Sequence, residues 1–142
     1  MGREPAERVA LMAIHERYAD AIMSGVKRVE FRKRRLADDI ETVWVYATAP
    51  VSKVIGRFSV DDIVQGSPQD IWDRFGAVGV IERDDYFRYY DGSATAVAIV
   101  VGEAERLPDP VGLDELEPRP AVPQSFAYLP VASSPSAMLA PV

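Results

Sequence analysis

The sequence lacks cysteine and contains a single histidine among its 142 residues. The absence of cysteine excludes disulfides, thiolate metal sites and cysteine nucleophiles. With His15 as the sole histidine, a metal site built from several histidines is also excluded. We expect His15 to be a partly buried residue at the end of a strand.

Long hydrophobic runs are absent from the first part of the chain as well. The apolar run at residues 9–14 is too short to span a bilayer. The residues before it lack the cationic start and continuous apolar stretch of a signal peptide. We therefore expect a soluble, cytoplasmic protein without a membrane partner.

Positive charge is scarce and unevenly distributed. The chain has 16 basic and 22 acidic residues, a formal net charge of −6. Residues 27–35 hold six of the basic residues around one glutamate, which leaves ten basic and 21 acidic residues elsewhere. This balance argues against a general nucleic-acid coat protein but allows one cationic surface for an anionic partner. An ordinary solvated run of charges is the alternative.

Periodicity and turn signals predict strands interrupted by short helices. A helix over residues 16–24 should end at Gly25, and a second should start at Ser67 and end at Gly76. The predicted strands cover residues 9–14, 29–32, 42–48, 53–64, 94–101 and 124–129, and a third short helix covers residues 82–90. This order predicts an α+β domain built on a compact, strongly bent sheet or barrel.

The length and composition are those of one domain, which we place at residues 1–129. Five prolines between positions 108 and 123 should break any long element there. Residues 130–142 contain no charged side chain and are mostly proline, alanine and serine, which predicts a flexible C-terminal tail.

Residues 13–32 resemble the signature of the ASCH domain family, in which a helix ending in glycine leads into a Gly-x-Lys-x-x-Glu-x-Arg motif. Here that motif runs from Gly25 to Arg32. Three further segments agree in order, at residues 45–50, 55–58 and 123–126, so the resemblance covers about residues 9–129. It implies a PUA-like β-barrel with short peripheral helices, a cleft bordered by the motif, and a role in RNA or nucleotide recognition.

The motif residues also have chemistry of their own. Lys27 and Arg32 can hold a phosphate or a base carbonyl, and arginine adds a planar fork of donors. Glu30 lies between them and can orient both cations or accept from an exocyclic base amine. A salt-bridged strand surface is the alternative. On a strand, Glu30 and Arg32 would share one face, with Val29 and Phe31 on the other.

Other residues are candidates for the same cleft. Tyr46 could stack on a base and, with Thr48 on the same strand face, donate a hydrogen bond. Lys53 could reach the cleft from the next strand, and Gln124, Ser125 and Phe126 offer an amide, a hydroxyl and a ring. Tyr46 and Phe126 could equally be core residues. The predicted binding residues are Lys27, Glu30, Arg32, Arg34, Tyr46, Thr48, Lys53, Gln124 and Ser125.

Three functions follow from this set. The first is a non-catalytic reader of single-stranded RNA or of a nucleoside. The second is a small hydrolase: a ribonuclease would use Lys53, Tyr46 and Ser125 as phosphate-holding and proton-transfer groups. The resemblance also implies an acetylcytidine amidohydrolase, which is disfavoured because Glu30 occupies the expected threonine position. The third is a transcription-related protein-interaction module.

Partners and cofactors follow from these functions. RNA or a nucleotide is the expected partner, a protein partner is open, and the sequence does not specify the oligomeric state. We expect no cofactor and no bound metal, with a divalent ion needed only if the protein is a nuclease. The acidic pairs at residues 38–39, 61–62 and 84–85 are expected to be solubilising charge, because adjacent carboxylates point apart.

Overall fold

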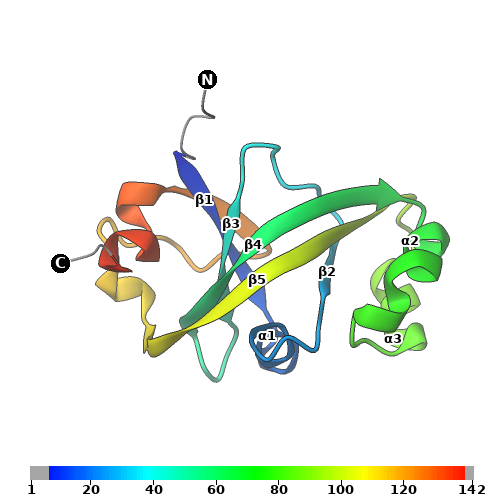
Figure 1. Cartoon of the computed structure of the whole chain (residues 1–142), viewed down its shortest axis with the longest axis horizontal. Helices are drawn as coiled ribbons and strands as arrows, with labels where there is room; N and C mark the ends of the chain where they lie inside the picture. The colour runs from blue at the N-terminus through cyan, green and yellow to red at the C-terminus, as the bar shows by residue number, and fades with distance from the viewer. Residues whose placement is uncertain (1–6, 140–142) are drawn as a thin grey trace.

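A six-stranded, strongly bent sheet forms the centre of the computed structural model, which describes residues 7–139 (Figure 1). The strand order is β2-β5-β4-β3-β1-β6. The strands are β1 (Arg8–Ile14), β2 (Val29–Arg32), β3 (Thr42–Ala47), β4 (Lys53–Gly66), β5 (Ala96–Val111) and β6 (Phe126–Pro130). The α-helices are α1 (Glu16–Met23), α2 (Pro68–Phe75) and α3 (Arg83–Tyr89). The predicted α+β class is confirmed.

The long antiparallel pair β4 and β5 gives the sheet its curvature, and Figure 1 shows it crossing the whole molecule. Its register shifts at three places, and each shift is an irregularity that bends and twists the strands. The predicted strand at residues 94–101 was too short, because β5 continues to Val111 through Pro108 and Pro110. Both prolines lie between the paired positions Arg106 and Val111, where the ladder is interrupted and their missing N–H groups are not needed.

Three hydrophobic clusters stabilise this sheet. The largest combines alternate residues of β1 and β3, such as Met12 and Val45, with Ala19 and Ile22 of α1. On the opposite face of the same strands, Leu11, Trp44 and Tyr46 pack against residues of the chain after β5. The alternation of strand side chains therefore places two separate cores on the two faces of β1 and β3.

The third cluster joins α2 and α3 to the sheet at one end of the molecule. Tyr86 is its centre: the ring centroids of Phe31, Trp72 and Phe87 each lie 4.9 Å away. The Ser67 hydroxyl caps α2 by accepting from the Asp70 N–H at 3.1 Å, as its sequence predicts.

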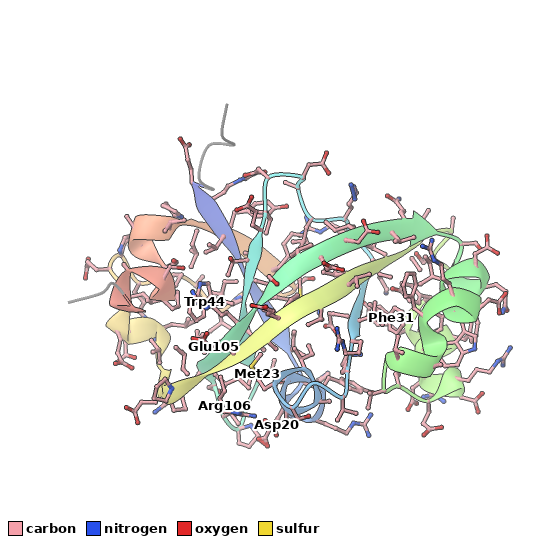
Figure 2. The ribbon with its side chains drawn as sticks, in the orientation of Figure 1. Asp20, Met23, Phe31, Trp44, Glu105 and Arg106 are labelled. Atoms are coloured by element: carbon pink, nitrogen blue, oxygen red, sulfur yellow. The ribbon has the colours of Figure 1, made fainter. Side chains whose placement is uncertain are left out.

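Helix α1 lies close against β4 and β5 (Figure 2). A Cβ atom on Gly56 would lie 2.4 Å from the Met23 sulfur and 2.6 Å from the Glu105 carbonyl oxygen, so only glycine fits at this approach. An ion pair of 3.1 Å between Asp20 and Arg106 spans the same contact. Gly25 then ends the helix at a φ of 82°, the conformation predicted for it.

The chain after β6 differs from the predicted flexible tail. Val131–Ser133 and Pro135–Leu139 form two 3-10 turns, and Ser134 is buried. The Trp44 indole N–H donates to the Ser136 hydroxyl at 3.0 Å, which holds the second turn against β3. Residues that composition alone assigned to a tail therefore cover the second hydrophobic cluster. Residues 140–142 lie outside the described part of the chain. No helix within residues 7–139 is long and apolar enough to cross a membrane.

Candidate functional site

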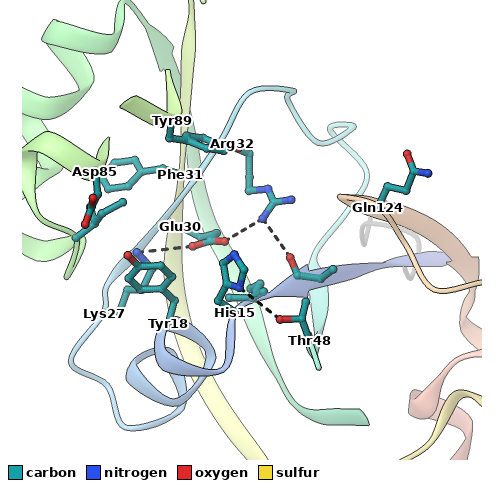
Figure 3. A pocket seen from close by; sticks show the side chains of 13 residues that line it. His15, Tyr18, Lys27, Glu30, Phe31, Arg32, Thr48, Asp85, Tyr89 and Gln124 are labelled. Atoms are coloured by element: carbon teal, nitrogen blue, oxygen red, sulfur yellow. Dashed lines mark hydrogen bonds and ion pairs between the residues drawn. The ribbon is translucent and has the colours of Figure 1, made fainter. Parts of the chain in front are cut away.

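A pocket of about 440 Å³ opens where β1 ends and α1 begins (Figure 3). β2 forms one wall of it, and α3 with the segment before it forms another. Its lining comprises Ala13, Ile14, His15, Tyr18, Lys27, Glu30, Phe31, Arg32, Thr48, Ile81, Asp85, Tyr89 and Gln124. A cavity of this size can hold a small ligand such as a nucleotide unit.

The alternation of β2 supplies the charged wall. Glu30 and Arg32 line the pocket, while Val29 and Phe31 join the aromatic cluster under α2 and α3. The prediction that these pairs take opposite faces is confirmed, although the Phe31 ring also reaches the pocket. A single four-residue strand therefore serves a core and a site.

Lys27 is the most deeply buried charged residue of the pocket, with 2% of its surface exposed. Its ammonium group donates to the Gly79 carbonyl oxygen and lies 3.7 Å from Glu30 Oε1. The rings of Tyr18 and Phe31 lie 5.0 and 5.3 Å from the nitrogen, within the range of cation–π contacts. Burial lowers the pKa of Lys27, and the charge of Glu30 opposes this shift.

Arg32 joins the two edges of the sheet. Its Nη1 donates to Glu30 Oε2 at 3.2 Å and to the Ala13 carbonyl oxygen at 3.3 Å, and its Nη2 donates to the Ser125 hydroxyl. β2 and β6 are the edge strands, so this side chain connects β2 to β1 and to the loop directly before β6. Its Nε is buried and has no hydrogen-bond partner among residues 7–139.

The rim of the pocket is aromatic and polar. Tyr18 of α1 and Tyr89 of α3 face it from two helices (Figure 3). Burial raises the pKa of the Tyr89 phenol. Thr48 Oγ1 lies 3.5 Å from His15 Nδ1, and Gln124 stands apart on the loop before β6. Together these groups can stack on a planar ring and exchange hydrogen bonds with it.

The charges of the pocket are nearly balanced. Lys27 and Arg32 share the carboxylate of Glu30, which leaves about one positive charge in the deepest part. Asp85 at the rim pairs with Arg88 at 2.8 Å. No group of three or more histidine, aspartate or glutamate side chains within residues 7–139 could hold a metal ion. The arrangement suits a singly charged anion, or a polar ring with both donors and acceptors.

Comparison with known proteins identifies this architecture. The family model described as the ASCH domain matches residues 12–105, which contain the end of β1, the charged motif and the β4–β5 pair up to Glu105. The chain belongs to the ASCH domain family. The predicted resemblance is confirmed, and the ASCH assignment agrees with the predicted PUA-like fold.

Relatives of known name or structure are similar to most of the chain. A protein named ASCH domain-containing ribonuclease, from Zymomonas mobilis subsp. mobilis, is 33% identical over 129 residues, covering 88% of this chain and 86% of that protein. The crystal structure of ASCH from Zymomonas mobilis is similar with a TM-score of 0.84 at 30% identity, covering 92% of this chain and 94% of that one. Large ribosomal subunit protein uL22 of Ureaplasma parvum serovar 3 is 32% identical over 103 residues, covering 72% of this chain but 33% of that protein.

The ASCH pocket brings together five of the nine predicted binding residues. These are Lys27, Glu30, Arg32, Thr48 and Gln124. Ser125 does not line the pocket but contacts it through Arg32. Arg34 lies outside it, exposed, with its guanidinium 4.6 Å from the Phe126 ring.

The structure separates Tyr46 and Lys53 from the pocket lining. Tyr46 is buried in the second hydrophobic cluster beside Trp44, because alternation along β3 turns both rings away from the larger core. Its backbone nevertheless pairs with that of pocket-lining Ala13. Lys53 is exposed where β4 starts. The expectation that Tyr46 and Thr48 present one common face to the site is not met, since only Thr48 lines the pocket.

Tyr18 and Tyr89 line the pocket but were not among the predicted binding residues. The environment of His15 was also predicted wrongly. It was expected to be partly buried at a strand end; it does follow β1, but its side chain is exposed at the pocket. It is the N-cap residue of α1. A histidine in the sequence does not predict this position, because the usual capping residues are serine, threonine, asparagine and aspartate. Its position directly before the helix of the ASCH signature is the one feature that could have indicated it.

Proposed function

We propose that this ASCH protein binds single-stranded RNA at the pocket and cleaves it. The observation that carries the proposal is the similarity, over most of both chains, to the Zymomonas mobilis protein named a ribonuclease. The pocket supports it with two cations for phosphate and two tyrosines for base stacking. A single-stranded substrate suits a concave site, because its bases are free to leave their stack.

Binding is assigned to the motif residues. Lys27 and Arg32 attract the phosphate, and Glu30 orients both cations and accepts from a base amine. Tyr18 and Tyr89 offer ring faces at the rim, and Thr48 offers a hydroxyl. Because Glu30 holds the side chains of Lys27 and Arg32 in place, the site is pre-organised before RNA binds.

The catalytic role of Lys53, Tyr46 and Ser125 is part of the same proposal. Ser125, directly before β6, and Tyr46 of β3 flank Ala13: the Ala13 N–H donates to the Ser125 carbonyl oxygen, and Ala13 pairs with Tyr46. Crystal structures of the Zymomonas mobilis protein include variants with a tyrosine changed to phenylalanine and a serine changed to alanine. These are the side-chain types of Tyr46 and Ser125, which makes the same changes informative here.

A second candidate is an RNA or nucleoside reader without cleavage. It is favoured by the mutual pairing of Lys27, Glu30 and Arg32, which leaves each of these groups hydrogen-bonded or ion-paired rather than free to react. The same pairing, with a carboxylate at the position where a threonine is expected, disfavours an acetylcytidine amidohydrolase. A protein-interaction module is the remaining alternative.

The test is a combined binding and cleavage assay with labelled single-stranded RNA, single-stranded DNA and free nucleosides, with and without Mg²⁺ or Mn²⁺. We expect RNA to bind and to be cut. Lys27→Met should weaken binding, and Tyr46→Phe, Ser125→Ala and Lys53→Ala should slow cleavage more than binding. Arg119→Ala, which removes an exposed cation far from the motif in sequence, is the matched control.

The outcomes separate the candidates. RNA that binds but stays intact under all metal conditions would leave the reader function in place of the nuclease. Absence of binding to any nucleic acid or nucleoside would contradict the pocket assignment and favour a protein partner. Equal binding by Lys27→Met and the wild type would contradict the role given to the motif.

A further inference from the structure

We infer that His15 is the general base of this site, taking the proton from the ribose 2′-hydroxyl of a bound RNA. The inference rests on the proposed ribonuclease function and deepens it by naming the group that acts as base and the substrate hydroxyl on which it acts. His15 lies between the last residue of β1 and the first of α1, and its carbonyl oxygen accepts the Ala19 N–H at 2.8 Å. Its side chain is therefore carried by a fixed part of the backbone while its ring remains accessible in the pocket (Figure 3).

Thr48 orients the His15 ring. Its backbone N–H donates to the Ile14 carbonyl oxygen at 3.0 Å, which holds residue 48 beside the end of β1. Its hydroxyl lies 3.5 Å from His15 Nδ1, a contact that ligand binding can shorten. When the hydroxyl oxygen accepts from Nδ1–H, the lone pair of the neutral ring is on Nε2. Thr48 is thus a positioning residue, and Nε2 is the atom available to a substrate.

The other ionisable groups of the pocket are less suited to accept this proton. Lys27 is buried, donates to Gly79 and faces Glu30, so its nitrogen is held as a donor. Both carboxylate oxygens of Glu30 face cations, and Asp85 pairs with Arg88. Phenols titrate well above neutral pH, whereas imidazole exchanges a proton near it. The ionisable and charged groups that surround His15 are Glu16, Arg17 and Tyr18 of α1, Lys27, Glu30 and Arg32 at β2, and Asp85 and Tyr89 of α3.

The pocket cations line the same cavity as His15. Figure 3 shows the His15 ring reaching toward Glu30 and Arg32, with Lys27 behind Tyr18. A phosphodiester drawn toward the excess positive charge of Lys27 and Arg32 would bring its ribose to the rim, where His15 and Thr48 lie. Base, orienting hydroxyl and phosphate-attracting cations thus come from three separate chain segments that the fold brings to one cavity.

The step is a transesterification. Neutral His15 Nε2 removes the 2′-hydroxyl proton, the 2′-oxygen forms a bond to phosphorus, and the bond from phosphorus to the 5′-oxygen of the next nucleotide breaks. That 5′-oxygen takes a proton from water, and His15 returns its proton to solvent, so protons and charge balance without a redox change. The products are a cyclic phosphate and a free 5′-hydroxyl. DNA has no 2′-hydroxyl, so the inferred substrate class is RNA alone.

The experiment compares wild type, His15→Gln, Thr48→Val and the control Glu16→Gln on a labelled single-stranded RNA. Glu16 is the exposed neighbour of His15 and does not line the pocket. A general base typically contributes about 10²–10⁴-fold, so His15→Gln should lower kcat by at least about a hundredfold, with affinity within about threefold of wild type. The acidic limb of the wild-type pH–rate profile should be lost, Thr48→Val should fall in between, and Glu16→Gln should match the wild type.

A second arm uses the same RNA with one 2′-deoxy nucleotide. The wild type should not cut after that nucleotide, and its other products should end in a cyclic phosphate. A His15→Gln variant that keeps wild-type kcat and pH profile, cleavage after the deoxy nucleotide, or the absence of cyclic phosphate would each overturn the role of His15 while leaving the nuclease proposal standing. A folded wild type that binds but never cuts RNA would overturn both.

Discussion

The two faces of β2 are built from neighbouring residues and differ in almost every physical property. Val29 and Phe31 face a cluster of aromatic rings in which every member is neutral. Glu30 and Arg32 face the pocket, where a buried lysine completes a group of three charges. One strand of four residues is therefore half core and half site.

The difference indicates which face stabilises the protein and which one serves function. Burying an aromatic side chain gains free energy directly. Burying charges costs desolvation free energy that their mutual attraction only partly offsets, so apolar residues of similar size would often be as stable. The presence of Lys27, Glu30 and Arg32 in a cavity is thus poorly explained by stability and well explained by the proposed ligand binding.

The largest effect is expected on the apolar face. Tyr86→Ala should lower the free energy of unfolding by about 3–5 kcal/mol, because it empties the centre of the aromatic cluster. Chemical denaturation followed by circular dichroism measures it. Tyr86→Phe, which removes only the hydroxyl bonded to the Pro68 carbonyl oxygen at 2.7 Å, should cost about 1 kcal/mol. Equal losses for both variants would show that the hydroxyl, not ring packing, dominates.

A smaller loss of stability is expected on the charged face, where replacing one residue should cost more than replacing all three. Arg32→Met should cost about 2–3 kcal/mol, because it leaves Glu30 with Lys27 as its one nearby cation and separates the sheet edges. Replacing the whole group, as Lys27→Met with Glu30→Leu and Arg32→Leu, should be closer to the wild type in stability yet lose RNA binding. Denaturation and binding titrations on the same preparations give both quantities. A triple variant less stable than Arg32→Met would contradict the comparison.

Salt should affect only the charged face. If RNA binding neutralises about two phosphates, the affinity should fall roughly sevenfold between about 50 and about 200 mM salt. Fluorescence anisotropy with labelled single-stranded RNA measures this, with the thermal unfolding midpoint followed in the same buffers. A salt-independent affinity would indicate that apolar contacts dominate binding.

The last expected effect is a loss of stability at alkaline pH that originates on the apolar face. Burial raises the pKa of Tyr86 to about 12 from its ordinary 10.0, so the folded state keeps a proton that the unfolded state releases. The free energy of unfolding should therefore fall as the pH rises from about 10 through about 12. Burial also raises the pKa of Tyr90, which acts in the same direction. Tyr86→Phe should flatten this dependence, and an unchanged slope in that variant would exclude Tyr86 as its source.

Local patterns in the sequence were sufficient for much of the molecule. The capping of α2 by Ser67, the glycine at the end of α1 and the opposite faces of β2 each depend on a few adjacent residues. The charged motif could also be named in advance, because its residues are close together in the chain and the ASCH resemblance singled them out. These features depend on the backbone and side-chain preferences of a few neighbouring residues, which can be read from the sequence alone.

Tertiary structure decided the features that depend on distant partners. The continuation of β5 through Pro108 and Pro110 depends on where the β4 register shifts. The packing of Val131 and Ser136 depends on the second hydrophobic cluster, which they cover. The burial of Tyr46 and the opening of His15 to the pocket follow from which strand face is covered and where β1 meets α1. Composition and periodicity report the preferences of each segment, whereas these outcomes were set by contacts between segments far apart in the chain.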